Sequence, residues 1–154
     1  MKTKTFSRAL IGAFAILASA GVMSAPTHHD KYEGVQATEV PMLDGGKTII
    51  GQSFNYPTGA PKLQTYNVRI NPGKPTNMHK HSIPVLVQVV SGRLEVDYGS
   101  KGKRTIKKGE AYVEAINWCH QGLAAAGKPV TVQVTYLGQE GADTIKPTEC
   151  TKLD

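Results

Sequence analysis

The sequence predicts an all-β fold, built as a sandwich or barrel of short strands. Alternating apolar and polar residues define about seven to nine such strands, and turn signals separate them at a spacing of roughly ten residues. The apolar residues that follow the N-terminal stretch do not repeat with the 3.6-residue period of a helix. With 154 residues, the chain has the length of one domain.

The N-terminal segment has the three regions of a secretory signal peptide. Lys2, Lys4 and Arg8 form a basic start, residues 9–17 an apolar core, and Ala18-Ser19-Ala20 a small-residue cleavage signal. We expect residues 1–20 to be removed, with cleavage as late as residue 25 as one alternative and a retained N-terminal anchor as another. The mature chain would then be exported, in the periplasm, without a membrane segment.

Removal of this segment also weakens the basic character of the chain. The mature protein keeps 15 Lys and Arg against 12 Asp and Glu, a net charge of +3. Its basic cluster at residues 101–108 surrounds a predicted hairpin and contains no interleaved aromatic residues, so nucleic acid is not an expected partner. Basic residues at such a position are typical of a solvated sheet edge.

The elements follow in order between an irregular N-terminal segment and a polar C-terminal tail. Residues 26–46 contain Pro26, Pro41, Gly45 and Gly46 and are expected to be irregular. Residues 47–138 form the predicted domain, and residues 139–154 a polar tail. Turns are marked by Gly and Pro, and strands by β-branched, alternating runs. The expected strands are Lys47–Asn55, Leu63–Ile70, a short strand carrying His79 and His81, Val85–Val90, Leu94–Tyr98, Arg104–Ile106, Ala111–Ile116, a strand after His120, and Val130–Leu137.

Three histidines are the candidate metal ligands. His79 and His81 are two residues apart, so in a strand their side chains share one face. His120 follows a second predicted strand and completes a set of three if the strands meet. Imidazole is the commonest protein ligand for transition metals. The expected cofactor is a divalent transition metal (Fe, Cu, Zn, Ni or Mn), and the donor set does not choose among these.

These histidines lie in two motifs that resemble those of the cupins. Gly73, His79, His81 and Gly92 match the first motif in spacing, and Gly109 and His120 match the second. The resemblance covers about residues 66–138 and implies a small antiparallel β-barrel of the cupin, or jelly-roll, type with a metal site in its mouth. It also implies a possible homodimer.

The motif match departs from the family pattern at several places. The glutamate ligand of the first motif is replaced by Val85, or by Leu86 in the longer spacing. In the second motif the usual proline is Ala115, the usual glycine is Asn117 and the usual asparagine is Ala124. The histidines are thus kept and the carboxylate is lost, which is similar to three-histidine cupins, a group that includes dioxygenases.

Strand parity gives expectations for the residues around the histidines. Counting from His81, Val85, Val87 and Val89 face inward and Gln88 faces outward. Glu114 lies on the strand that leads to His120, but the intervening loop breaks the count. It is therefore either a surface residue or an inward carboxylate that binds metal or acts as an acid–base group, the one catalytic candidate.

Two cysteines allow one intramolecular disulfide, Cys119–Cys150, which would clip the tail to the loop that carries His120. An exported chain is in a compartment where disulfides persist. The alternatives are a Cys119 thiolate beside the metal, and free or intermolecular thiols.

Two functions remain open from sequence. One is a metal-dependent oxidoreductase of dioxygenase type that acts on a small anionic or enolisable molecule. The other is a non-catalytic periplasmic cupin that binds a metal or a small ligand.

Overall fold

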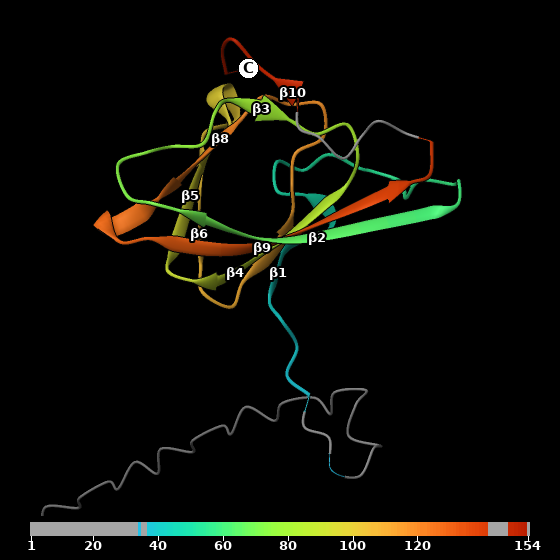
Figure 1. The fold of residues 1–154 in the computed structure, drawn as a ribbon, viewed down its shortest axis with the longest axis horizontal. Coiled ribbons are helices and arrows are strands. Elements are labelled where there is room, and N and C mark those ends of the chain that lie inside the picture. Colours follow the sequence, from blue (N-terminus) through green and yellow to red (C-terminus); the bar gives the residue numbers. More distant parts are fainter. Residues whose placement is uncertain (1–33, 35–36, 142–147, 154) are drawn as a thin grey trace, which may run out of the picture. The chain divides into compact units, whose positions relative to one another are not determined.

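Three β-sheets make up the described part of the chain (Figure 1). The computed structural model describes residues 34, 37–141 and 148–153, and residues 39–154 form one unit. The expected signal peptide lies outside the described residues. The strands are β1 (Met42–Thr48), β2 (Pro61–Ile70), β3 (His79–Lys80), β4 (Val85–Ser91), β5 (Arg93–Asp97), β6 (Lys103–Lys107), β7 (Ala111–Val113), β8 (Gln121–Ala124), β9 (Val130–Gln139) and β10 (Thr148–Glu149).

The two larger sheets enclose the core. One has the order β1-β7-β4-β9-β2 and the other the order β6-β5-β8, and neither closes into a continuous barrel. Two short 3₁₀ turns, Gly99–Lys101 and Ala125–Gly127, are the only helical elements among the described residues. None of the described helices is long and apolar enough to cross a membrane. The all-β prediction is confirmed.

Strand β4 shows how the sequence pattern positions the core. Val85, Val87 and Val89 are buried, whereas Gln88 between them is partly exposed. This confirms the parity expected from His81. The buried valines join Leu94 and Val96 of β5 and Val130 and Val132 of β9 in one apolar cluster between the two sheets. Burial of such aliphatic side chains stabilises the fold by roughly 1.5–3 kcal/mol each.

The N-terminal strand differs from the prediction. β1 begins at Met42, inside the segment expected to be irregular, and ends at Thr48 rather than Asn55. The strand ends there because Thr48 and Gln52 close a turn, with the Thr48 amide donating to the Gln52 carbonyl at 2.9 Å. Gly51 has a φ of 83°, which suits glycine in that turn. β1 also pairs in parallel with β7, an exception to the antiparallel pattern expected.

Strand β7 is shorter than predicted, and β10 was not predicted at all. β7 ends at Val113 instead of Ile116, because the chain then turns to bring Asn117 to the backbone of His81. β10 lies in the polar tail, where no strand was expected. It pairs antiparallel with β3, and Figure 1 shows both strands at one end of the unit.

Candidate metal centre

Backbone pairing brings two of the three histidines onto one face. His79 and His120 form an antiparallel bridge in which each amide donates to the other's carbonyl at 2.9 Å. Residues paired in this way project their side chains to the same side. Their ring centroids are 4.6 Å apart. The two segments that carry these histidines therefore meet at His79 and His120.

The third histidine is held by the loop that precedes His120. The Asn117 amide donates to the His81 carbonyl at 2.6 Å, and His81 bridges Ile116 in parallel. Asn117 has a φ of 52°, a left-handed conformation that asparagine tolerates better than most residues. This explains how asparagine can stand where the family motif has glycine. One nitrogen from each of the three rings lies within 4.8 Å of the others.

Hydrogen bonds fix the tautomers of two of these rings. His79 Nδ1 lies 2.6 Å from the Asn77 carbonyl oxygen, and His120 Nδ1 lies 2.8 Å from that of Trp118. A carbonyl oxygen only accepts, so each Nδ1 carries the hydrogen. In the neutral ring, Nε2 then has a free lone pair, the form that binds a metal.

Two buried ring nitrogens have no hydrogen-bond partner among the described residues. They are His81 Nδ1 and His120 Nε2. Buried polar atoms are normally paired, so each such atom calls for an explanation. A cation held between the rings would satisfy the His120 lone pair. The three histidines therefore fit a transition metal, by donor type and by arrangement.

Glu114 is buried beside these rings, so it is the inward carboxylate and not a surface residue. Its Oε1 accepts hydrogen bonds from the Tyr98 hydroxyl at 2.6 Å and the Ala115 amide at 2.8 Å. Its Oε2 accepts one from the Tyr112 hydroxyl at 3.1 Å and lies 3.6 Å from His120 Nε2. Only 4 % of the residue is exposed, so these three donors replace water around a buried charge.

The environment sets the protonation of each group. Burial, partly offset by the charge of Glu114, lowers the pKa of His81 to about 3, and burial also lowers the pKa of His79. Burial alone would raise the pKa of Glu114, but His120 and the hydrogen bond from Tyr98 hold it below its ordinary value. Burial and Glu114 raise the pKa values of Tyr98 and Tyr112, so both hydroxyls keep their protons.

A small cavity opens beside the three histidines and Glu114. Its volume is about 130 Å³, close to the roughly 150 Å³ of an apolar cavity that accommodates benzene. Aliphatic side chains from both sheets form most of its wall. They are Val68, Ile70, Val87, Leu94, Val96, Val132 and Val134, and the rest of the wall is formed by Thr76, Gly122, Tyr112 and Tyr136.

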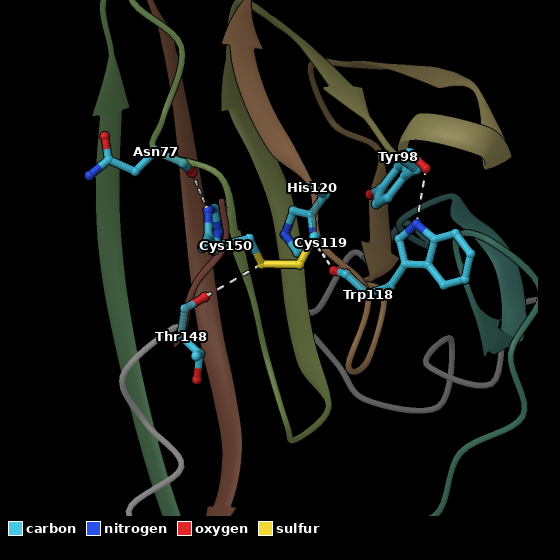
Figure 2. Close-up of a disulfide and its surroundings, with 8 residues drawn as sticks. Asn77, Tyr98, Trp118, Cys119, His120, Thr148 and Cys150 are labelled. Carbon is cyan, nitrogen blue, oxygen red and sulfur yellow. Dashed lines mark hydrogen bonds between the residues drawn. A yellow bond between two sulfur atoms is a disulfide. The ribbon is translucent and has the colours of Figure 1, made fainter. Parts of the chain in front are cut away.

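A disulfide ties the C-terminal tail to the loop that carries His120. Cys119 and Cys150 are bonded, with their Cα atoms 6.1 Å apart, which confirms the predicted pair and excludes a free thiolate at Cys119. Figure 2 shows this disulfide, whose Cys119 directly precedes His120 in the chain, and the Trp118 indole donating to the Tyr98 carbonyl. The Cys150 amide also donates to the Met78 carbonyl at 2.9 Å, next to His79.

Sequence reasoning missed the two tyrosines that hold Glu114. The sequence could have predicted that Tyr112 lies beside Glu114, because Tyr112 is two residues earlier on an expected strand and so shares its face. Tyr98 directly follows β5, and nothing in the sequence links it to Glu114. The β3–β10 pairing was also missed, because two-residue strands leave no periodic signal.

Comparisons with known proteins found similar solved structures. No family model and no curated protein sequence matches the chain. Among solved structures, the polyketide cyclase RemF from Streptomyces resistomycificus is 14% identical, with a TM-score of 0.50 over 63% of this chain and 65% of that one. A cupin-like protein from Thermotoga maritima is 25% identical, with a TM-score of 0.46 over 49% and 56%. The DMSP lyase DddQ from Ruegeria pomeroyi is 17% identical, with a TM-score of 0.48 over 56% and 42%.

This chain spans less than two thirds of the length of each of those three proteins. The likeness concerns the fold alone. Taken with the two motifs and the sheet arrangement, the fold is that of the cupins, as the sequence predicted. The fold and the site together define the class of this protein: a cupin-fold protein with three histidines that could hold a metal ion.

Proposed function

We propose that the protein is an exported cupin that binds one divalent transition metal through His79, His81 and His120 and acts on a small anionic or enolisable molecule. Dioxygenase-type oxidation is the activity to test first. The observation that carries this proposal is the convergence of three ring nitrogens within 4.8 Å at the edge of an apolar cavity. A metal there would supply Lewis acidity and open coordination positions.

The residues of the chain give this site its selectivity. Aliphatic walls favour an apolar body of about the size of one aromatic ring. Histidine ligands are neutral, so they leave the charge of a dication available to an anionic group of the ligand. Tyr136 is partly exposed, lies with its ring 5.7 Å from that of His81, and lines the cavity. Catecholates and enolates of short β-diketones match these features.

Export is part of the proposal. The disulfide supports it, because such bonds persist in oxidising compartments and are rare in the cytosol. The second support is the signal peptide that the sequence of the N-terminal segment predicts.

Oxygen uptake by metal-loaded protein tests the proposal. The mature protein is reconstituted separately with Fe²⁺, Cu²⁺, Ni²⁺, Mn²⁺ and Zn²⁺, and offered catechols and β-diketones, with three-ring flavonols as oversized controls. We expect uptake with one redox-active metal and with the smaller compounds. Val132→Phe fills part of the cavity at a wall residue that is not a proposed metal ligand, so it should retain metal and lose activity. Ligand binding without turnover for every metal would instead favour a non-catalytic binding protein.

A further inference from the structure

The position where the first cupin motif loses its carboxylate faces Glu114 across two paired strands. In β4 and β7, Leu86 pairs with Val113 and Val87 with Tyr112, and the Glu114 amide donates to the Val85 carbonyl at 2.8 Å. Val85 and Glu114 are thus direct cross-strand neighbours, and such neighbours share a face of the sheet. Both are buried.

The hydrogen bonds of Glu114 leave room for one more partner, on one oxygen. Each carboxylate oxygen accepts about two hydrogen bonds. Oε1 has two, from Tyr98 and the Ala115 amide, whereas Oε2 has one, from Tyr112. The remaining site on Oε2 is therefore free for another donor or a cation.

That oxygen faces the unpartnered nitrogen of a candidate metal ligand. Oε2 of Glu114 and Nε2 of His120 are 3.6 Å apart, too far for a hydrogen bond. Because the Nδ1 hydrogen of His120 is directed at the Trp118 carbonyl, the Nε2 of the neutral ring offers a lone pair. Two buried lone-pair atoms that face one another are stabilised by a shared cation.

We propose that Glu114 is the fourth protein ligand of the metal site, supplied from the residue directly after β7 and not from β4, where the family motif carries it. Tyr98 and Tyr112 act as positioning residues that hold its free oxygen toward His120. The inference rests on the proposed metal site and adds a charged ligand to it. Three neutral imidazoles and one carboxylate would leave a dication with one net positive charge, which suits a monoanionic ligand.

Metal affinity and the visible spectrum of bound Co²⁺ test this ligand together. The variants are Glu114→Gln, which removes the charge with little change in shape, and Glu140→Gln, an exposed carboxylate on the chain after β9 that serves as the control. We expect Glu114→Gln to bind Co²⁺ and Zn²⁺ at least about 100-fold more weakly, beyond the usual effect of losing an outer-shell partner. The Co²⁺ bands should shift with the change of ligand set.

A second, independent test moves the carboxylate from residue 114 to residue 85. The double variant Val85→Glu/Glu114→Val restores it at the position of the family motif, and should recover affinity to within about tenfold of the unaltered protein. If the double variant does not fold, Glu114→Asp replaces it in the test, because aspartate keeps the charge. Its metal affinity is expected to lie between that of the unaltered protein and that of Glu114→Gln.

Two results overturn the inference. One is Glu114→Gln with unchanged affinity, and the other is a weaker affinity with unchanged Co²⁺ bands, which would place Glu114 outside the coordination sphere. In either case, loss of metal in His79→Ala would leave the three-histidine site standing. Failure of the unaltered protein to bind metal would instead refute the proposed function itself.

Discussion

Glu114 lies directly opposite Val85 across the β4–β7 strand pair, and its amide donates to the Val85 carbonyl at 2.8 Å. The side chain that the motif lacks at Val85 is therefore matched by a buried carboxylate on the residue that directly follows the neighbouring strand β7. Because paired residues share a face, this exchange keeps a negative charge beside the histidines without disturbing the sheet.

The two tyrosines should contribute unequally to stability. Tyr98→Phe removes a 2.6 Å hydrogen bond to the buried carboxylate, whereas Tyr112→Phe removes one of 3.1 Å. Hydrogen bonds to charged groups contribute about 1.5–3 kcal/mol, and we expect Tyr98→Phe near the upper end and Tyr112→Phe near the lower. Urea unfolding of the metal-free protein measures both.

Tyr56→Phe is the matched control for these variants, because Tyr56 is 69% exposed. It should leave the free energy of unfolding unchanged. If all three variants unfold alike, the hydroxyl groups do not stabilise Glu114 as described.

The metal-free protein should lose stability as the pH falls below 6.5. His81 has an ordinary pKa of 6.5 and a folded-state pKa of about 3, and the pKa of His79 is also lowered. Below pH 6.5 these two histidines bind protons in the unfolded chain but remain largely neutral in the folded protein. Acid therefore favours unfolding. Each ring that is still neutral in the folded state contributes a slope of about 1.4 kcal/mol per pH unit.

Urea unfolding at several pH values between 7.5 and 5 measures this slope, and that range avoids most of the titration of carboxylates. His81→Asn, which has a similar shape and does not titrate, should make the dependence shallower. A stability that is flat over this range in the unaltered protein would show that the rings take up protons as readily when folded.

The disulfide should support both stability and metal affinity. It closes a loop with a sequence separation of 31 residues, for which the chain-entropy estimate is about 3–4 kcal/mol. Its loss should also free β10 from β3, where Glu149 pairs with His79. Cys119→Ala/Cys150→Ala should therefore unfold at lower urea and bind Zn²⁺ more weakly.

Reduction of the unaltered protein provides the control for that pair of substitutions, because it breaks the bond without changing a side chain. It should reproduce both effects. Unchanged Zn²⁺ affinity in both samples would mean that the tail does not help to position His79.

Two motif glycines should differ in the cost of substitution. Gly92 and Gly109 have φ values of 81° and 89°, so alanine is strained at either position, by roughly 1–2 kcal/mol. A Cβ at Gly92 would also lie 2.5 Å from the Pro129 carbonyl oxygen, whereas one at Gly109 meets nothing within 4 Å. Gly92→Ala should therefore be the more destabilising, as thermal unfolding would show, and equal losses would contradict the close approach.

The sequence predicted the parts of this fold that have a local signal. The alternation of Val85, Val87 and Val89 marks a buried strand face, and the spacing of His79 and His81 gives them one direction. Glu114 remained ambiguous, because the loop between β7 and His120 interrupts the alternation. Its burial depends on Tyr98 and Tyr112, and the hydrogen bond from Tyr98 joins residues that lie 16 apart in sequence, on either side of β6.

The boundaries at both ends of the domain were harder to predict. β1 lies in a segment with two glycines, whose low strand propensity hides a pairing that β7 provides. β10 has two residues, and its formation depends on the Cys119–Cys150 bond and the neighbouring backbone of β3 rather than on its own sequence.

Elemental analysis of the mature protein, purified from its own exported compartment, tests the central claim most directly. The His79→Ala/His81→Ala variant is analysed beside it, with circular dichroism to verify folding. We predict about one transition metal per chain in the unaltered protein and none in the variant. Absence of metal from the unaltered protein, together with no uptake on reconstitution, would contradict the account of this site as a metal centre.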